Sequence, residues 1–191
     1  MINPVLDFLL TRRSVKPVAM SGPGPSATEL QQILTVAARV PDHKKMVPWR
    51  FIVFEGDARA RFGEALATAC AAEEKEPPSP MRLETERKRF LDAPLIVGVV
   101  SRVVPHPGAP EWEQVLSAGA ACFNVCLAAN ALGYASNWLT GWYAYSPMVK
   151  AHLGLGSGER IAGFVYVGTA KERPEDRERP ALASLVTHYG G

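Results

Sequence analysis

One stretch of this sequence restricts the fold more than any other: a long helical segment from about Pro110 to Leu132. Its middle, residues 117–131, is dense in Ala, Gly, Cys and Asn and is apolar on nearly all sides. A helix that is apolar all round is buried rather than amphipathic, and its small side chains let a neighbouring helix approach closely. Gly133 follows in the position where a helix commonly ends. The pattern therefore predicts a central helix with the other elements arranged around it.

The remaining periodicity predicts short helices and strands in alternation. We expect further helices from Asn3-Pro4 to about residue 13, from the capping box at residues 26–29 to Pro41, from Asp57 to about residue 72, over 82–90 and from Ser146 to Gly154. Strands are expected over 51–54, 95–100, 134–138 and 161–167. Residues 16–25 are expected to form a loop, and the helix over 82–90 is expected to be exposed to solvent. This order predicts an α+β fold with one sheet between helices. The tail beyond Gly168 has too few apolar residues to fold alone, so we expect it to pack on another surface.

Composition excludes several classes of protein. The 21 Lys and Arg against 19 Asp and Glu leave a net charge of +2, which argues against general nucleic-acid binding. No apolar run is long enough for a membrane span, and the N-terminus lacks a signal-peptide pattern, so we expect a cytoplasmic location. Cys70, Cys122 and Cys126 have no metal ligands near them in the sequence and are expected to be small buried residues without a metal.

The usual nucleotide-binding and hydrolase motifs are missing, so four weaker clusters are the candidates for chemistry. In the first, Arg12, Arg13 and Ser14 end a helix, where two guanidinium groups and a hydroxyl can hold a phosphate. The alternative is that these basic residues only favour the negative end of the helix dipole.

The other three clusters lie at the ends of predicted strands: one precedes a strand, and two follow strands. Residues 39–49 (RVPDHKKMVPW) place several cations and His43 just before a buried strand, which makes them a candidate binding segment. The alternative is that they form an ordinary solvated loop. Residues 137–142 (NWLTGW) offer polar groups, a glycine and aromatic planes, or else a core Trp and a turn. Lys171 and Arg173 lie just beyond the last strand, where they bind an anion or simply carry surface charge.

The order of these clusters resembles the nitroreductase family of flavoproteins over nearly the whole chain. Arg-Arg-Ser after an N-terminal helix, a loop ending in Pro-Trp, a small-residue helix, Trp-Leu-Thr-Gly and then Phe-Val-Tyr-Val-Gly-Thr occur in sequence. The stretch R-V-P-D-H-K-K-M-V-P-W is the most specific, and is similar to the short, minimal branch of that family.

The resemblance implies a three-layer sandwich with a central, mostly antiparallel sheet flanked by helices. It implies one domain over residues 1–191, with an extended C-terminal arm from about 170 to 191 packing on a partner subunit. It further implies a homodimer with two FMN molecules at the interface. NADH or NADPH would reduce FMN, which would pass electrons to a nitroaromatic, quinone or related acceptor by a ping-pong mechanism, so that FMN and no side chain carries the chemistry.

The same resemblance assigns roles to single residues. Arg12, Arg13 and Ser14 would hold the FMN phosphate and ribityl chain, and Lys171 or Arg173 would close on the phosphate. Arg39 and His43 would reach the FMN of the other subunit. The isoalloxazine ring would be lined by Trp138, Leu139 and Thr140, with a backbone N–H near Gly141 facing its N5. Thr140-Gly141 stands where larger members have Glu-Gly, which leaves the acceptor open.

Two other functions remain open on the sequence. A protein of this fold can carry or sense flavin without catalysis, and a flavin dehydrogenase, dehalogenase or flavin-cleaving enzyme can use the same pocket.

Overall fold

A computed structural model describes residues 3–172 and 174–190 of the chain. The helices are α1 (Pro4–Thr11), α2 (Ala27–Ala37), α3 (Ala58–Glu73), α4 (Pro80–Lys88), α5 (Glu111–Ala131) and α6 (Pro147–His152). The strands are β1 (Met20–Ser21), β2 (Trp49–Glu55), β3 (Leu95–Arg102), β4 (Ala135–Leu139) and β5 (Glu159–Ala170). Short 3-10 turns complete the chain, among them residues 142–144 directly after β4.

β5 organises the sheet, because it pairs with three other strands. β3 lies antiparallel to it, β2 lies antiparallel to β3, and β4 pairs with β5 from Ala135 opposite Gly168 to Leu139 opposite Phe164. Alternate residues of β3 point to opposite faces: Leu95, Val97 and Val99 enter one core cluster, and Ile96 and Val100 the other. The sheet therefore has two buried faces and two separate cores.

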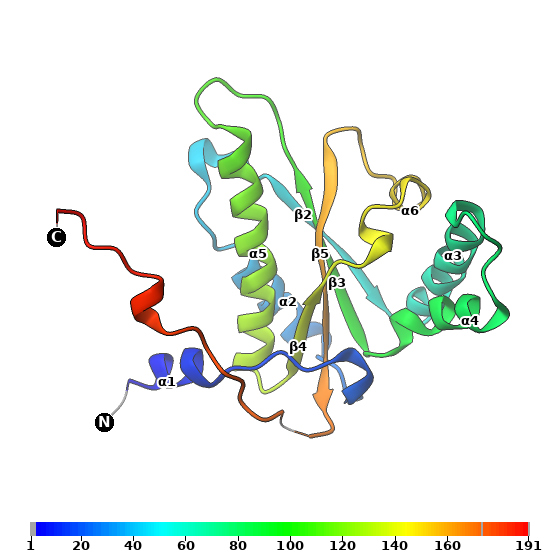
Figure 1. The fold of residues 1–191 in the computed structure, drawn as a ribbon, viewed down its shortest axis with the longest axis horizontal. Helices are drawn as coiled ribbons and strands as arrows, with labels where there is room; N and C mark the ends of the chain where they lie inside the picture. The colour runs from blue at the N-terminus through cyan, green and yellow to red at the C-terminus, as the bar shows by residue number, and fades with distance from the viewer. Residues whose placement is uncertain (1–2, 173, 191) are drawn as a thin grey trace.

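Helices cover both faces, which confirms the expected three-layer arrangement (Figure 1). α5 packs on β3, β4 and β5, with α2 against it, while α3, α4 and α6 lie on the other side. Ala118, Ala121, Cys122 and Val125 of α5 are fully buried, as the small-residue pattern predicts. Of the helices in the described residues, α5 is long and apolar enough to cross a membrane, a test that a core helix also passes.

Three expectations were wrong in detail. Residues 16–25 are not all loop, because Met20 and Ser21 pair with Ala170 and Thr169 as β1. α2 ends at Ala37 rather than at Pro41, since residues just before a proline avoid helical geometry. The helix over 82–90 is not simply solvated: Glu86 is 0% exposed, and two arginines neutralise it.

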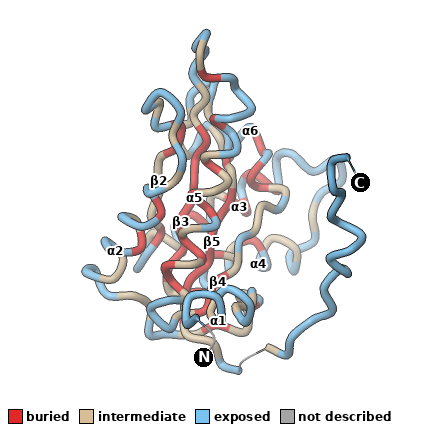
Figure 2. Tube along the Cα trace, turned by 90° about the vertical axis from the view of Figure 1, so that its left-hand side faces the viewer, coloured by how far each residue is buried: buried red, intermediate tan, exposed pale blue. Residues whose placement is uncertain are grey.

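The C-terminal segment leaves the body of the molecule. Residues 175–190 are all exposed and run away from the sheet (Figures 1 and 2). Leu182, Leu185 and Val186 are 72%, 66% and 46% exposed, and Val5 and Leu10 of α1 are also uncovered. These apolar side chains are thus uncovered within a single chain.

One ion pair across the sheet predicts a pH dependence of stability. Arg50 Nε and Nη2 donate to both carboxylate oxygens of Glu159 at 2.7 and 2.8 Å. Hydrogen bonding by Arg50 outweighs burial and lowers the pKa of Glu159 to about 2. Because the folded pKa lies below the ordinary value, the stabilisation is present above pH ~4.5 and is lost as the pH falls toward 2.

We therefore expect Glu159→Gln to lower the free energy of unfolding by about 1–2 kcal/mol at pH 7, a value reduced for the partial exposure of both side chains. Urea unfolding of wild type and variant at several pH values measures this difference. It should shrink steadily below pH ~4.5. A difference that stays constant down to pH ~2.5 would show that the ion pair is not its source.

Candidate active site

The Arg12–Ser14 cluster lies where α1 ends and the backbone becomes extended. Arg12 is the C-cap of α1, and its N–H donates to the Phe8 carbonyl. Its guanidinium carbon lies 5.4 Å from the centre of the Phe123 ring on α5, and its Nη2 donates to Ser14 Oγ at 3.4 Å. Arg12 Nε is buried and has no hydrogen-bond partner among the described residues. A buried, unpaired guanidinium N–H is costly, and an anion is the ligand that would satisfy it.

Backbone hydrogen bonds tie this cluster to the start of β4. The Val15 N–H donates to the Ser136 carbonyl at 3.1 Å, and Asn137 Nδ2 donates to the Val15 carbonyl at 2.9 Å. The segment is thereby fixed to β4 as well as to α1. β4 then leads from the arginines toward Thr140–Gly141, about 16 Å away at ~3.3 Å per residue. The first and third clusters of the sequence therefore lie along one strand.

Arginines from distant parts of the chain meet at this point. A cavity of about 170 Å³ is lined by Arg12, Arg13, Ser14, Arg177 and Arg179. Asp176 accepts from Arg13 at 3.5 Å and from Arg179 at 3.2 Å. This single carboxylate offsets only part of the charge of the four arginines, so the lining stays positive. Arg177 and Arg179 were not among the candidates, and only the run of charges over 171–179 (KERPEDRER) could have drawn attention to them.

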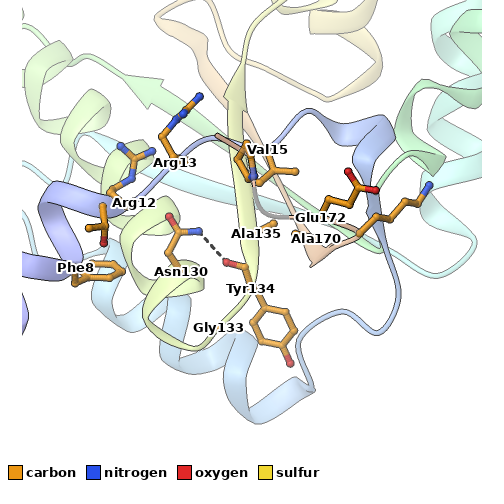
Figure 3. A pocket seen from close by; sticks show the side chains of 13 residues that line it. Phe8, Arg12, Arg13, Val15, Asn130, Gly133, Tyr134, Ala135, Ala170 and Glu172 are labelled. Carbon is orange, nitrogen blue, oxygen red and sulfur yellow. Dashed lines mark hydrogen bonds between the residues drawn. The ribbon is translucent and has the colours of Figure 1, made fainter. Parts of the chain in front are cut away.

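A larger neighbouring cavity of about 500 Å³ also includes Arg12 and Arg13 (Figure 3). Lys171 lines it as well, with its Nζ donating to the Val18 carbonyl at 3.2 Å. On the α5 side Asn130 donates to the Tyr134 carbonyl, while its Oδ1 is buried and lacks a partner among the described residues. The structure thus places Lys171 on the lining of the cavity that both arginines also line, together with Glu172. Arg173 lies outside the described residues.

β4 ends in a turn that presents backbone rather than reactive side chains. Trp138 is 39% exposed, and its Nε1 donates to the Ala162 carbonyl at 3.1 Å, so the indole lies over β5. Leu139 and Thr140 are half-buried. Gly141 has φ +70°, and a Cβ there would stand 2.5 Å from Tyr143 Cε1. Only glycine fits this position, so the turn exposes its backbone to solvent at the sheet edge.

The loop before β2 is held in an unusual conformation. Lys44, Lys45 and Val47 all have positive φ, at 59°, 55° and 47°. The Asp42 carboxylate accepts the Val47 N–H at 3.1 Å, and Arg102 Nε donates to the Val47 carbonyl at 2.9 Å. Positive φ at a β-branched residue is strained, by about 1–3 kcal/mol, and such strain clusters at functional sites. The loop is therefore an ordered feature rather than a solvated connection.

The second cluster lies apart from the first within one chain. His43 is exposed, and its Nδ1 lies 2.6 Å from Glu113 Oε2 near the N-terminal end of α5. Arg12 lies instead over Phe123, about 15 Å further along that helix at 1.5 Å per residue. Arg39 is exposed, and its carbonyl accepts from Asn124 at 3.2 Å. Arg39 and His43 thus face outward on the α5 side.

The buried thiols do not belong to this site. Cys70, Cys122 and Cys126 are free and buried, as expected. Burial raises the pKa of both Cys122 and Cys126 above the ordinary value for a thiol. A thiol that stays protonated is a poor nucleophile. The site therefore offers cations, backbone N–H groups and aromatic planes rather than an activated thiol.

Comparison with known proteins identifies what kind of chain this is. The family model described as the nitroreductase family matches residues 9–169. The chain belongs to the nitroreductase family.

Curated relatives and solved structures agree with that assignment. YdjA of Escherichia coli K12, by its name an NAD(P)H nitroreductase, is 37% identical over 167 residues, which is 86% of this chain and 87% of YdjA. A Haemophilus influenzae protein of similar name is 33% identical over 89% of this chain and 90% of its own. A nitroreductase-like family protein from Bacillus cereus has a TM-score of 0.84 at 22% identity, covering 100% of this chain and 98% of its own.

A nitroreductase structure with bound FMN from Bacteroides fragilis also has the same fold. Its TM-score is 0.71 at 24% identity, covering 97% of this chain and 98% of that one.

Proposed function

We propose that this nitroreductase-family chain is an FMN-dependent NAD(P)H oxidoreductase. The observation that carries the proposal is the line of groups along β4, from a buried arginine N–H that lacks a partner to an exposed backbone turn at Gly141. In such enzymes FMN takes electrons from NADH or NADPH and delivers them to a nitroaromatic, quinone or related acceptor in a ping-pong cycle. The names of the curated relatives support the same activity.

The residues along this line fit the two ends of FMN. At one end Arg12, Arg13 and Ser14 would hold the phosphate by charge-assisted hydrogen bonds. Lys171 lines the adjoining cavity, and Arg173 is proposed to close on the same phosphate. Arg177 and Arg179 add to the positive charge of this end.

At the other end of the line, the ring system would lie along Trp138, Leu139 and Thr140. A backbone N–H of the turn at Gly141 would face the flavin N5. The chain's task is to orient the cofactor and exclude water, because none of the side chains along this line is an activated nucleophile.

A homodimer completes the proposed site. Apolar side chains are exposed on α1, α5 and the arm, and a second subunit would bury them. They are Val5, Leu6, Leu9, Leu10, Leu116, Phe123, Leu182 and Leu185. Residues 1–191 would form one domain whose arm, from about residue 170, packs on the partner. Arg39, just beyond α2, and His43, in the strained loop, face outward and would reach the FMN held by the other subunit. We propose a cytoplasmic location for this dimer.

A mixture of two inactive variants tests the shared site. In a heterodimer of an Arg12→Ala chain and a His43→Ala chain, both defects fall in one site and the other site is intact. Such heterodimers should recover about half of the wild-type activity, whereas each variant homodimer stays impaired. Pairing Arg12→Ala with Arg13→Ala is the matched control, since that heterodimer has one defect in each site. Recovery no greater than in this control would mean that His43 serves its own subunit's flavin.

The absorption spectrum of the purified protein tests the function itself. A yellow protein whose flavin absorbance is lost within seconds of adding NADH or NADPH without oxygen is a reductase. A yellow protein that keeps its absorbance is instead a flavin carrier or sensor, or a flavin dehydrogenase or dehalogenase that takes electrons from another donor. A colourless protein that takes up no added FMN would contradict the proposal.

A further inference from the structure

A buried carboxylate lies on the face of the sheet opposite α5. Glu86 of α4 is fully buried in an otherwise charged helix. Arg89 Nε and Nη2 donate to its two oxygens at 2.6 Å each, and Arg82 Nη1 donates to the same carboxylate. Burying a carboxylate is expensive unless its partners are well placed. The residues proposed to contact FMN do not include this cluster, so the burial of this charge needs another explanation.

The two arginines that hold Glu86 lie on the aromatic residues that directly follow Gly141. The guanidinium carbon of Arg82 is 5.9 Å from the centre of the Trp142 ring, and that of Arg89 is 5.4 Å from the centre of the Tyr143 ring. The Trp142 indole is close enough to help lower the pKa of Glu86, although its buried Nε1 makes no well-aligned hydrogen bond to the described residues. Glu86 therefore holds two cations that lie over the aromatic rings of the turn after β4.

Tyr143 in turn determines the path of the backbone at Gly141. Its ring is 2% exposed, and its hydroxyl lies 3.3 Å from that of Tyr166 on β5. The ring stands so close to Gly141 that a Cβ there would be 2.5 Å from Cε1. A shift of the Tyr143 ring would therefore move the backbone N–H groups of the turn.

We propose that Glu86 is a positioning residue for the flavin. Glu86 holds Arg82 and Arg89, which in turn fix Trp142 and Tyr143. These two aromatic residues hold the Thr140–Gly141 turn in the position in which its N–H faces the flavin ring. This inference rests on the proposed function. It assigns a role to a residue that touches neither cofactor nor substrate and acts on the turn through the residues that it holds. It also explains why α4 buries a charge where an apolar side chain would fill the space at lower cost.

Glu86→Gln keeps the size of the side chain and removes its charge. We expect the rate of flavin reduction by NADH, or by NADPH if that is the better donor, to fall about tenfold in anaerobic rapid mixing, because a small displacement of a positioning group has effects of this size. The visible absorption bands of the bound FMN should shift, since the hydrogen bond to the ring changes. The dissociation constant of FMN should change by no more than about threefold, because the arginines at the phosphate end are untouched.

Glu159→Gln is the matched control. It also takes the carboxylate from a half-buried arginine and lowers stability, but it lies beside Arg50 rather than behind the flavin turn. Its flavin spectrum and reduction rate should equal those of wild type. If Glu86→Gln does not fold, Arg89→Lys provides the test, because it keeps the charge, loses the two-pronged contact, and should show the same spectral shift in weaker form.

The outcomes separate this inference from the proposed function. Wild type that binds FMN, together with variants of unchanged spectrum and reduction rate, would overturn the positioning role alone. Equal effects in Glu86→Gln and Glu159→Gln would also overturn it, because they would reflect lost stability. A wild-type chain that takes up no FMN would overturn the proposed function and with it this role.

Discussion

Replacing Arg12 by alanine is expected to weaken FMN binding by about ten- to a hundred-fold. A hydrogen bond from a charged group contributes roughly 1.5–3 kcal/mol, and each 1.4 kcal/mol is about tenfold in affinity. Arg12 is the arginine whose Nε is buried without a partner, so it has the most to gain from the phosphate. Arg13→Ala should act in the same direction but less strongly, because Arg13 already pairs with Asp176. Titration of the apoprotein with FMN, followed by flavin fluorescence, measures both.

An arginine on the other side of the sheet is the control for this experiment. Arg61 lies exposed on α3, and Arg61→Ala removes the same charge without touching the proposed site. Its FMN affinity should equal that of wild type at every salt concentration. The defect of Arg12→Ala should largely persist at high salt, because buried charges are screened much less than exposed ones. Wild-type affinity in both Arg12→Ala and Arg13→Ala would remove these residues from the phosphate site.

Glu86→Gln is expected to destabilise the fold by about 2–3 kcal/mol at pH 7. Removing one partner of a buried ion pair costs roughly 3–5 kcal/mol, and the value here is reduced because Arg82 and Arg89 are about one third exposed. The variant leaves two guanidinium groups facing each other across a neutral amide. Glu84→Gln on the same helix is the control: its partner Lys88 is exposed, so little stability should be lost. Urea unfolding at pH 7 measures both variants.

The pH dependence of that difference follows from the ion pairs. Burial alone would raise the pKa of Glu86, but hydrogen bonds and charge from Arg89, with help from Arg82, lower it below the ordinary value. The stabilisation is therefore complete above pH ~4.5 and is lost as the pH falls through the lowered pKa. Wild type and Glu86→Gln should approach each other in stability under acid conditions. A gap that widens on acidification would contradict this assignment.

Local pattern was enough to predict most of the elements. The Ser26–Glu29 capping box forms at the start of α2, and Gly133 follows α5 with φ +88°. The strands expected over 51–54, 95–100, 134–138 and 161–167 all form, with ends that differ by a few residues. Caps, turns and apolar periodicity depend on residues close in the chain, which is why a single sequence reveals them.

What was missed depends on distant residues. β1 has only two residues and forms because Met20 and Ser21 meet the end of β5. Val47 has a positive φ angle, and its carbonyl is held by Arg102 of β3. Arg179 reaches the arginine cavity only through the path of the arm. None of these features has a local sequence signal, because the contacts that stabilise them join residues far apart in the chain.

The sequence by itself determined the central small-residue helix, the α+β order of elements and the identity of the Arg12–Ser14 cluster. Only the tertiary structure decided that this cluster is hydrogen-bonded to the start of β4, the strand that leads to Gly141. It also decided that α4 buries Glu86 next to the turn that contains Gly141. The physical reason is the range of the interactions. Helix and strand patterns repeat every 3.6 and 2 residues, so near neighbours reveal them. Even the arginines that pair with Glu86 are its neighbours along the helix, whereas Trp142 and Tyr143, on which those arginines lie, come from a distant turn.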